Sequence, residues 1–336
     1  MATGRERVGR VEPIPGEPAA IVETSTEDVG PDVDGDWTTE DSTDADGEAN
    51  AGSVLAADAN TDRRSAERAL VVADYHAGLE EGLRRQGVSV PSHAADRRDS
   101  LTTLLDETGA GRAVFLGDLA HAIGDPRGPE REELEDLFEA VSERASTVVV
   151  KGNHDGGIES VVEEGGFEAV SVTPTNGIRI GAVGFAHGHT WPAPEVIRAP
   201  ICCIAHEHPT VRLTDSVGGR RVEPAWLRGD LDRTPFEAHG HGGTGNEADD
   251  GGDTDNTDAN DADASEAKAT CDDGNATAAA GNGSELVVFP AFNDLVGGTW
   301  VNVPEQGFLS PFLPEGLVGG EAYLLDGTRL GDYRQV

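Results

Sequence analysis

Lysine, cysteine, aromatic residues and long apolar runs are all scarce in this chain of 336 residues. No run of 18 apolar residues occurs and the start of the chain is polar, so the sequence predicts neither a membrane span nor a signal peptide. Cys202, Cys203 and Cys271 show no C-x-x-C spacing, and the two adjacent cysteines on a predicted strand would point to opposite faces. We therefore expect reduced thiols in a cytoplasmic protein.

Positive charge is also scarce, because 25 basic residues face 63 acidic ones and the net charge is -38. Lys151 and Lys268 are the only lysines. Such a composition is typical of adaptation to high salt, where the Debye length falls to about 3 Å near 1 M and surface carboxylates stop repelling one another. The acidity is therefore only weak evidence against a nucleic-acid substrate. The arginine pairs at 84–85, 97–98 and 220–221 are interpreted as scattered surface residues, because no aromatic residues interleave with them.

The acidic residues are concentrated in two segments of low complexity. Residues 1–62 hold 16 acidic and 3 basic residues, and residues 236–285 hold 13 and 1. Both have few large apolar side chains, so they cannot bury enough surface to offset the entropy of ordering. We predict a disordered acidic tail over 1–62 and a single domain over 63–336, interrupted by a disordered insert over 236–285. The histidines at 239 and 241 are interpreted as part of this flexible loop rather than as metal ligands.

Between these segments, apolar strand-like runs alternate with amphipathic helices. Strands are expected at 69–73, 113–116 and 147–150, with helices at 94–109 and 129–145. This order predicts parallel strands whose carboxyl ends meet at one edge, where ligands bind in open α/β sheets. After residue 165 the pattern changes to strands, including a hairpin from 211 to 222 that turns at Gly218-Gly219. Two mixed sheets flanked by helices would fit.

Five polar motifs follow the apolar runs in order. They are Asp74-Tyr75-His76, Gly117-Asp118, Gly152-Asn153-His154-Asp155, His187-Gly188-His189 and His206-Glu207-His208. Oxygen and imidazole ligands gathered in this way are typical of a site for two metal ions.

The motifs resemble the signature of the calcineurin-like metallophosphoesterases, D-x-H, G-D, G-N-H-(D/E), H and G-H-x-H, except that Ala205 replaces the usual glycine before His206. The resemblance implies a four-layer αββα sandwich and a hydrolase that attacks phosphodiester bonds with a metal-bridging hydroxide. It makes Asp118 the ligand shared by two ions. Asp74, His76 and His208 would complete one shell, and Asn153, His187 and His206 the other.

The resemblance also assigns His154 a catalytic role, to protonate the leaving oxygen or to stabilise developing charge. We predict that Asp155 orients its ring, and that His121 and His189 contact substrate or support the ligands. A ligand set without thiolate favours Mn²⁺, Fe or Zn²⁺, with Mn²⁺ preferred.

Local sequence narrows the expected substrate. The stretches at 74–80, 117–121, 206–209, 290–293 and 309–311 resemble a branch of phosphoesterases linked to DNA ligases or large helicases in repair. The first hypothesis is therefore a phosphodiesterase acting on DNA or RNA, with a helicase or ligase as partner. The alternatives are a nucleotide or cyclic-nucleotide phosphoesterase with a narrow pocket lined by Trp191 and His189, and a non-catalytic, metal-stabilised partner of a helicase or ligase.

Overall fold

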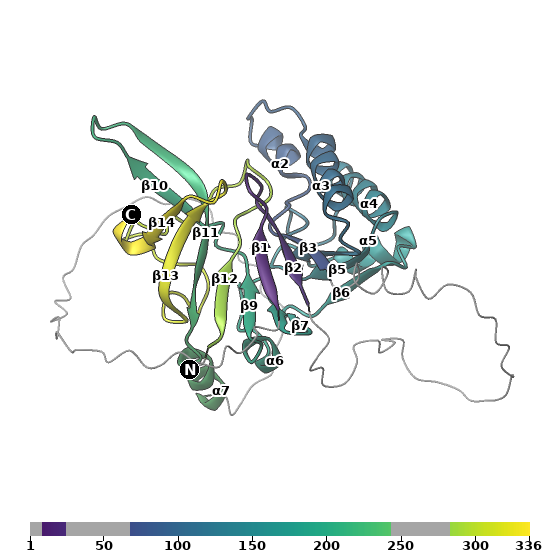
Figure 1. The fold of residues 1–336 in the computed structure, drawn as a ribbon. Helices are drawn as coiled ribbons and strands as arrows, with labels where there is room; N and C mark the ends of the chain where they lie inside the picture. Colours follow the sequence, from purple (N-terminus) through teal and green to yellow (C-terminus); the bar gives the residue numbers. More distant parts are fainter. Residues whose placement is uncertain (1–8, 25–67, 243–282) are drawn as a thin grey trace, which may run out of the picture.

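The computed structural model describes residues 9–24, 68–242 and 283–336, which form two β-sheets (Figure 1). The first sheet has six strands in the order β1-β2-β3-β4-β5-β6. The second has eight, in the order β14-β13-β11-β12-β9-β8-β7 with β10 paired to β11. Both sheets mix parallel and antiparallel neighbours. The predicted α/β architecture with two mixed sheets is therefore confirmed.

The first sheet follows the predicted alternation of strand and helix. Its parallel strands are β3 (Arg68–Val72), β4 (Arg112–Leu116), β5 (Ser146–Val150) and β6 (Val170–Thr173). The helices between them are α2 (Leu79–Arg85), α3 (Ala94–Thr108), α4 (Pro129–Ser142) and α5 (Ile158–Gly165). Pro129 occupies the first turn of α4, where its missing N–H costs nothing.

Two strands of the first sheet come from the start of the chain, where a disordered tail was predicted. β1 (Arg10–Pro13) and β2 (Ala19–Glu23) form a hairpin, and β2 pairs antiparallel with β3. The prediction for 1–62 is therefore wrong over residues 9–24, because the run Ala19-Ala20-Ile21-Val22 buries its side chains despite the acidic sequence around it. The rest of the predicted tail lies outside the described residues.

The second sheet contains mainly short strands from the C-terminal half. They are β7 (Ile178–Ile180), β8 (Val183–Phe185), β9 (Ile201–Ile204), β10 (Thr210–Thr214), β11 (Arg220–Leu231), β12 (Glu285–Val288), β13 (Leu317–Leu324) and β14 (Arg329–Asp332). The predicted hairpin is present as β10 and β11, and Gly218 lies in its turn with φ 88°. Trp300 joins this region through an isolated bridge to Thr210.

The predicted boundaries of the insert are wrong at both ends. Residues 236–242 belong to helix α7 (Thr234–Gly242), and β12 already begins at Glu285. His239 is therefore helical rather than part of a loop, and its ring stacks on Trp191 at 4.2 Å between centroids. Residues 243–282 lie outside the described part of the chain.

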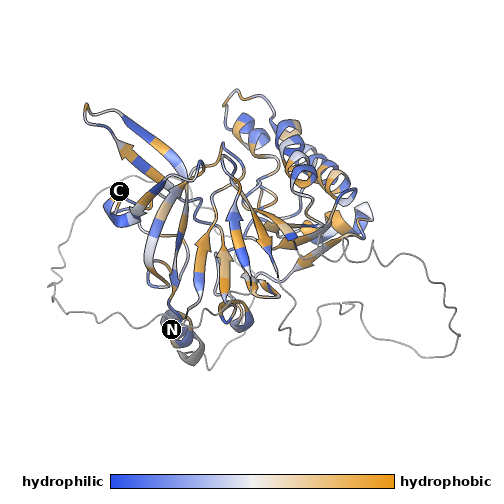
Figure 2. Ribbon diagram, viewed as in Figure 1, coloured by the Kyte–Doolittle hydropathy of each residue, from blue (hydrophilic) through white to orange (hydrophobic). Residues whose placement is uncertain are grey.

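Three apolar clusters hold the layers together. One lies between the sheets and includes Val71, Val114, Phe185, Trp226 and Phe289. A second lies under α3, α4 and α5, and a third lies on the outer face of the second sheet, under α6 (Pro194–Ile197) and the segment 301–317. The strands are largely apolar, whereas the outer faces of α3 and α4 are hydrophilic (Figure 2).

Cys202 and Cys203 are buried, free thiols on β9, as expected, and Cys271 lies outside the described residues. Within the part of the chain that the structure describes, no helix has the length and apolar character needed to cross a membrane.

Candidate metal centre

The predicted metal ligands lie where strands of both sheets end. Asp74 and His76 follow β3, Asp118 follows β4, and Asn153 follows β5. His187 follows β8, and the pair His206 and His208 follows β9. Neighbouring parallel strands carry their carboxyl ends to one edge, so residues distant in sequence meet there.

Five of these residues adopt a left-handed backbone that non-glycine residues rarely use. The φ angles are 53° at Asp74, 50° at His76, 50° at Asp118, 69° at His206 and 42° at His208. Such conformations cost roughly 1–3 kcal/mol each and persist only where the surrounding structure enforces them. The fold therefore turns each strand end sharply enough to aim its side chain at a common point.

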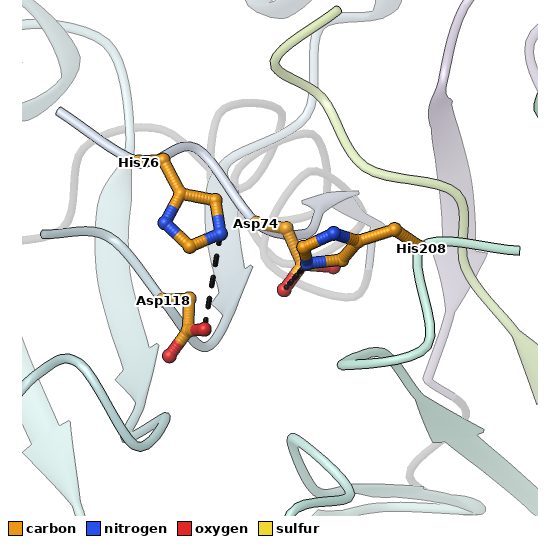
Figure 3. Close-up of side chains that lie close together, drawn as sticks. All are labelled: Asp74, His76, Asp118 and His208. Atoms are coloured by element: carbon orange, nitrogen blue, oxygen red, sulfur yellow. Dashed lines mark ion pairs between the residues drawn. The ribbon is translucent and has the colours of Figure 1, made fainter. Parts of the chain in front are cut away.

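A first group of side chains consists of Asp74, His76, Asp118 and His208, whose ligand atoms all lie within 4.8 Å of one another (Figure 3). The Nε2 atom of His208 lies 3.2 Å from Oδ1 of Asp74, and Nε2 of His76 lies 3.8 Å from Oδ2 of Asp118. Both oxygens of Asp74 and both ring nitrogens of His76 are buried without a hydrogen-bond partner. Unpartnered buried polar atoms are costly unless another group, such as a cation, satisfies them.

A second group consists of Asp118, His187 and His206, again with ligand atoms within 4.8 Å. The Nε2 atom of His187 lies 3.4 Å from Oδ1 of Asp118 and 3.2 Å from Oδ1 of Asn153. Asp118 thus belongs to both groups and offers one oxygen to each. A shared carboxylate is the arrangement that two closely spaced divalent ions require.

Backbone carbonyls orient two of the histidine rings. Nδ1 of His187 lies 3.0 Å from the carbonyl oxygen of Leu116, and Nδ1 of His208 lies 2.8 Å from that of Gly297. With Nδ1–H donating to a carbonyl, each ring directs the lone pair of Nε2 into the site. This is the tautomer that a metal ligand needs.

The carboxylates give the site a strongly negative field. Burial alone would raise the pKa of Asp118, but its hydrogen bond to His187 and the charges of His187 and His76 hold that pKa well below its usual range. Burial would lower the pKa of His187 and His208, but Asp118 and Asp74 respectively raise each to about 9. Burial instead dominates for His76 and His206 and lowers each pKa to about 4. The donor set therefore attracts positive charge.

Two glycines allow the ligands to approach the backbone closely. A Cβ atom on Gly152 would lie 2.1 Å from Oδ1 of Asp118, and one on Gly117 would lie 2.2 Å from Nδ1 of His187. Gly117 immediately precedes Asp118 in the chain, and Gly152 immediately precedes Asn153. At these two positions, close packing excludes any larger residue.

His154 lies beside the shared carboxylate, but Asp155 does not orient it. Nδ1 of His154 contacts the carbonyl oxygen of His121 at 2.5 Å, and its Nε2 lies 3.9 Å from Oδ2 of Asp118. The oxygens of Asp155 instead accept from the backbone N–H groups of Ala120 and Gly152 at 3.0 and 2.8 Å. The prediction that Asp155 orients His154 is therefore wrong, since its carboxylate links two motif loops.

His121 and His189 flank the cluster on different sides. The His121 ring lies parallel to that of His154 with centroids 6.0 Å apart, whereas the His189 ring is 5.3 Å from that of His187. Burial lowers the pKa of both, to about 4 for His189. Nδ1 of each ring is buried without a hydrogen-bond partner. A contact with substrate remains a prediction for both.

Glu207 is a supporting residue that the sequence did not single out. It lies between His206 and His208, is fully buried, and accepts hydrogen bonds from the N–H groups of Leu309 and Ser310 and from the hydroxyl of Thr299. These bonds fix the histidine pair to the loops behind it. Its position between two ligands on a short turn was the available signal.

Ala205, which replaces the usual glycine, causes no distortion, because its φ lies outside the left-handed region. Its N–H donates to the carbonyl of His187 at 2.8 Å and so ties the last two histidine motifs together.

A buried ion cluster lies behind the first motif, centred on Arg97. Its guanidinium contacts Glu80 through two hydrogen bonds of 2.6 and 3.0 Å and Glu133 through one of 2.7 Å. Arg97 is only 6% exposed, so its interpretation as a surface residue is wrong. Glu133 also accepts from the N–H of Gly78, and Arg97 lies over the ring of Tyr75 at 5.4 Å. The cluster thereby fixes helices α2, α3 and α4 to the Asp74–His76 loop.

Asn293 supports the same loop from the second sheet. Its side-chain N–H group donates to the carbonyl oxygen of Tyr75 at 3.1 Å, and its backbone N–H donates to that of Asp74 at 3.4 Å. This contact gives the 290–293 stretch a role in supporting the metal site. Its similarity to the repair-linked branch is therefore a weaker indication of substrate than the sequence alone indicated.

Comparisons with known proteins agree with this geometry. The family model for calcineurin-like phosphoesterases matches residues 67–267, and the chain belongs to that family. Among curated protein sequences, none matches the chain.

Solved structures that resemble it include a nuclease and a phosphoesterase. The Pseudomonas putida nuclease MPE is 16% identical, with a TM-score of 0.42 over 77% of this chain and 84% of that one. The E. coli phosphoesterase Yfce is 17% identical, with a TM-score of 0.28 over 44% of this chain and 74% of that one.

The chain is thus a metal-dependent hydrolase of the phosphoesterase class, and its donor set fits divalent ions. Carboxylate oxygens, imidazole nitrogens and one amide oxygen, with no thiolate among them, suit intermediate to hard cations.

Proposed function

We propose that this protein hydrolyses phosphodiester bonds in DNA or RNA, using two divalent ions held by the two groups of ligands. The observation that carries the proposal is the shared position of Asp118, which offers one oxygen toward each group. Ions held in this way would neutralise the phosphoryl oxygens and acidify water. The remaining roles fall to residues of the chain itself.

His154 is the proposed general acid. Its Nδ1–H donates to the carbonyl of His121, so a proton on Nε2, which faces the Asp118 side of the centre, is present only in the doubly protonated imidazolium. The leaving oxygen would take that Nε2 proton and leave the neutral ring behind. The side chain is 24% exposed, so a substrate can reach it. Because a fixed imidazole contributes about 10²- to 10⁴-fold to proton transfer, its loss should affect poor leaving groups most.

Mn²⁺ is the proposed native metal. The mixture of buried carboxylate, amide and imidazole donors suits Mn²⁺, Fe or Zn²⁺, whereas the two cysteines in the described residues lie on β9, inside the fold.

A nucleic-acid substrate in a repair context, with a helicase or ligase as partner, is the proposed setting. Its support is the resemblance of the motif stretches at 74–80 and 117–121 to repair-linked phosphoesterases. The narrow-pocket alternative loses one of its elements, because Trp191 packs against Phe236, Phe312 and the stacked ring of His239. To form the apolar wall of a nucleotide pocket, the Trp191 ring would need to be free of these contacts.

The test compares two substrates with Mn²⁺-loaded protein in high KCl: bis-p-nitrophenyl phosphate and nicked DNA. We expect both to be cut, and Asp118→Asn to abolish both activities. His154→Ala should lose far more activity on DNA than on the small diester. The alkoxide that leaves from DNA needs a proton, whereas p-nitrophenolate leaves without one. If only the small diester is cut, the proposal of a nucleic-acid substrate is rejected. If neither substrate is cut, the proposed phosphodiesterase activity is rejected.

A further inference from the structure

A two-stranded ribbon projects beside the metal centre. It consists of β10 and the first part of β11, residues 210–224, and is called the arm here (Figure 1, upper left). Pairing runs from Thr210 with Pro224 to Thr214 with Arg220. β11 joins β13 only from Ala225 onward and β12 only from Leu227, so no further strand among the described residues lies beside the arm, apart from the bridge between Thr210 and Trp300 at its base. An isolated ribbon of this kind is marginally stable unless something supports it.

The base of the arm is fixed to the metal centre. β10 begins two residues after His208, and the N–H of Thr210 donates to the carbonyl of Thr299 at 2.9 Å. The side chain of Asn302 bonds both the N–H and the carbonyl of Arg212, each at 2.9 Å. Thr299 is in turn bound to Glu207, between the two ligand histidines. The arm is therefore held in a defined orientation relative to the ligands.

The two faces of the arm differ in character. Residues directly opposite each other share a face, so Val211 and Leu213 lie with Glu223 and Arg221. This face turns inward, because Val211 is fully buried and Leu213 packs on the core. The opposite face carries Thr210, Arg212, Thr214, Arg220, Val222 and Pro224. It thus presents two guanidinium groups and no carboxylate, in a chain whose net charge is -38.

Both arginines on that face are available to a ligand. Arg212 lies over the ring of Trp300, 5.2 Å from its centroid, which positions the guanidinium without neutralising it. Arg220 is exposed, and no carboxylate among the described residues pairs with it. Val222, between them, is 47% exposed.

The tip of the arm is ordered by its own hydrogen bonds. One oxygen of Asp215 accepts from the N–H groups of Val217 and Gly219 at 2.9 and 2.7 Å. These two bonds hold the turn in place. Val217, at the tip, is 90% exposed.

We propose that the outer face of the arm binds the backbone phosphates of a nucleic-acid strand whose scissile phosphate lies at the metal centre. This inference rests on the proposed function and adds its substrate-binding surface. A chain this acidic repels a polyanion, so positive groups without acidic neighbours must be provided locally. Arg212 and Arg220 would each contact a phosphate, while Val222 would lie against a sugar or base.

The test uses the full chain with Arg212→Gln and Arg220→Gln combined. The matched control is Arg98→Gln with Arg144→Gln, which removes the same charge from the α3 and α4 side of the molecule. Hydrolysis of bis-p-nitrophenyl phosphate and of single-stranded DNA is measured with Mn²⁺ across a KCl series. Two further proteins, Arg220→Gln alone and the combined Arg212→Lys and Arg220→Lys variant, show whether a loss of activity comes from a folding defect.

We expect the arm variant to keep its activity on the small diester and to lose about tenfold or more in kcat/KM on DNA. The dependence of log(kcat/KM) on log[KCl] should become shallower by about 1.4, because roughly 0.7 is lost for each phosphate contact on a single strand. The lysine variant should retain most of the activity, and the control should behave as wild type.

Four results would overturn the proposal. Equal losses on DNA in the arm and control variants would indicate a general charge effect. A parallel loss on the small diester, also in Arg220→Gln, would indicate a structural role. If the wild-type protein cuts the small diester but not DNA, both the proposed substrate and the role of the arm are rejected. If the wild type cuts DNA and the arm variant cuts it equally well, only the role of the arm is rejected.

Discussion

Removal of Arg97 should destabilise the protein far more than loss of an ordinary surface arginine. Arg97→Met would leave the carboxylates of Glu80 and Glu133 facing each other, 2% and 9% exposed, without the cation that joins them. Breaking a buried ion cluster by removing one partner costs about 3–5 kcal/mol, because the remaining charges stay desolvated. The contact with the Tyr75 ring is lost as well.

The assay is urea unfolding at constant KCl, followed by circular dichroism, on wild type, Arg97→Met and a triple variant that adds Glu80→Gln and Glu133→Gln. The triple variant removes all three charges and should recover much of the lost free energy of unfolding. A loss below about 1 kcal/mol for Arg97→Met, the range of exposed ion pairs, would refute the reasoning. So would a triple variant less stable than the single one.

The Arg97 cluster also predicts that the stabilities of the wild type and of Arg97→Met change in opposite directions as the pH falls. In the wild type, burial tends to raise the pKa of Glu80, but hydrogen bonds to Arg97 and to the His93 N–H outweigh it, so the pKa is lowered overall. A lowered folded-state pKa contributes stability above the unfolded value of about 4.3, and this contribution is lost as the pH falls below it. In Arg97→Met the folded-state pKa should instead be raised, so the variant should gain stability relative to wild type as the pH falls from 7 toward 5. A constant difference between the two proteins over that range would contradict this account.

Three further predictions follow from contacts around the site. Gly152→Ala would place a Cβ atom 2.1 Å from Oδ1 of Asp118, so titration with Mn²⁺ should show a lower affinity for the metal. The control is Gly156→Ala, whose Cβ would meet no atom closer than 3.6 Å and which should bind Mn²⁺ as wild type does. Glu207→Gln replaces one acceptor oxygen, which bonds the Thr299 hydroxyl and the Leu309 N–H, by an NH2 donor, and should weaken metal binding about 10- to 100-fold with the fold intact by circular dichroism. Unchanged affinity would count against a supporting role. Deleting residues 1–62 removes β1 and β2 and should lower solubility and thermal stability. A shorter deletion of 28–60, which keeps both strands, should not, and equal behaviour of the two deletions would contradict the prediction.

Much of the first sheet could be predicted because its elements follow local rules. The helix expected at 94–109 is α3 at Ala94–Thr108, and the one expected at 129–145 is α4 at Pro129–Ser142. Their apolar spacing and the buried strands between them fix a parallel order, so the three ligand motifs that follow β3, β4 and β5 had to meet.

The contacts that the sequence could not reveal depend on packing between distant segments. Arg97 and Arg98 are neighbours in the chain, yet one is buried among carboxylates while the other lies on the surface, because α3 turns adjacent residues to different sides. Asp155 adjoins His154 but faces two backbone N–H groups instead, since its side chain points into the fold. β1 and β2 were missed because their short apolar runs are stable only against β3.

The N-terminal hairpin of β1 and β2 also suggests how the protein could be divided. The pair lies on β3 through five residue pairs, and the carbonyl of Val11 accepts a hydrogen bond from Arg228 of the second sheet. Glu23 and Arg68 are partners in that pairing, although 44 residues separate them along the chain. Residues 9–24 therefore make up an edge piece joined to the rest by noncovalent contacts at its strands. We expect that a chain cut between Thr24 and Arg68 could be reassembled from two separately produced fragments, with the enzyme switched on when the small one is supplied.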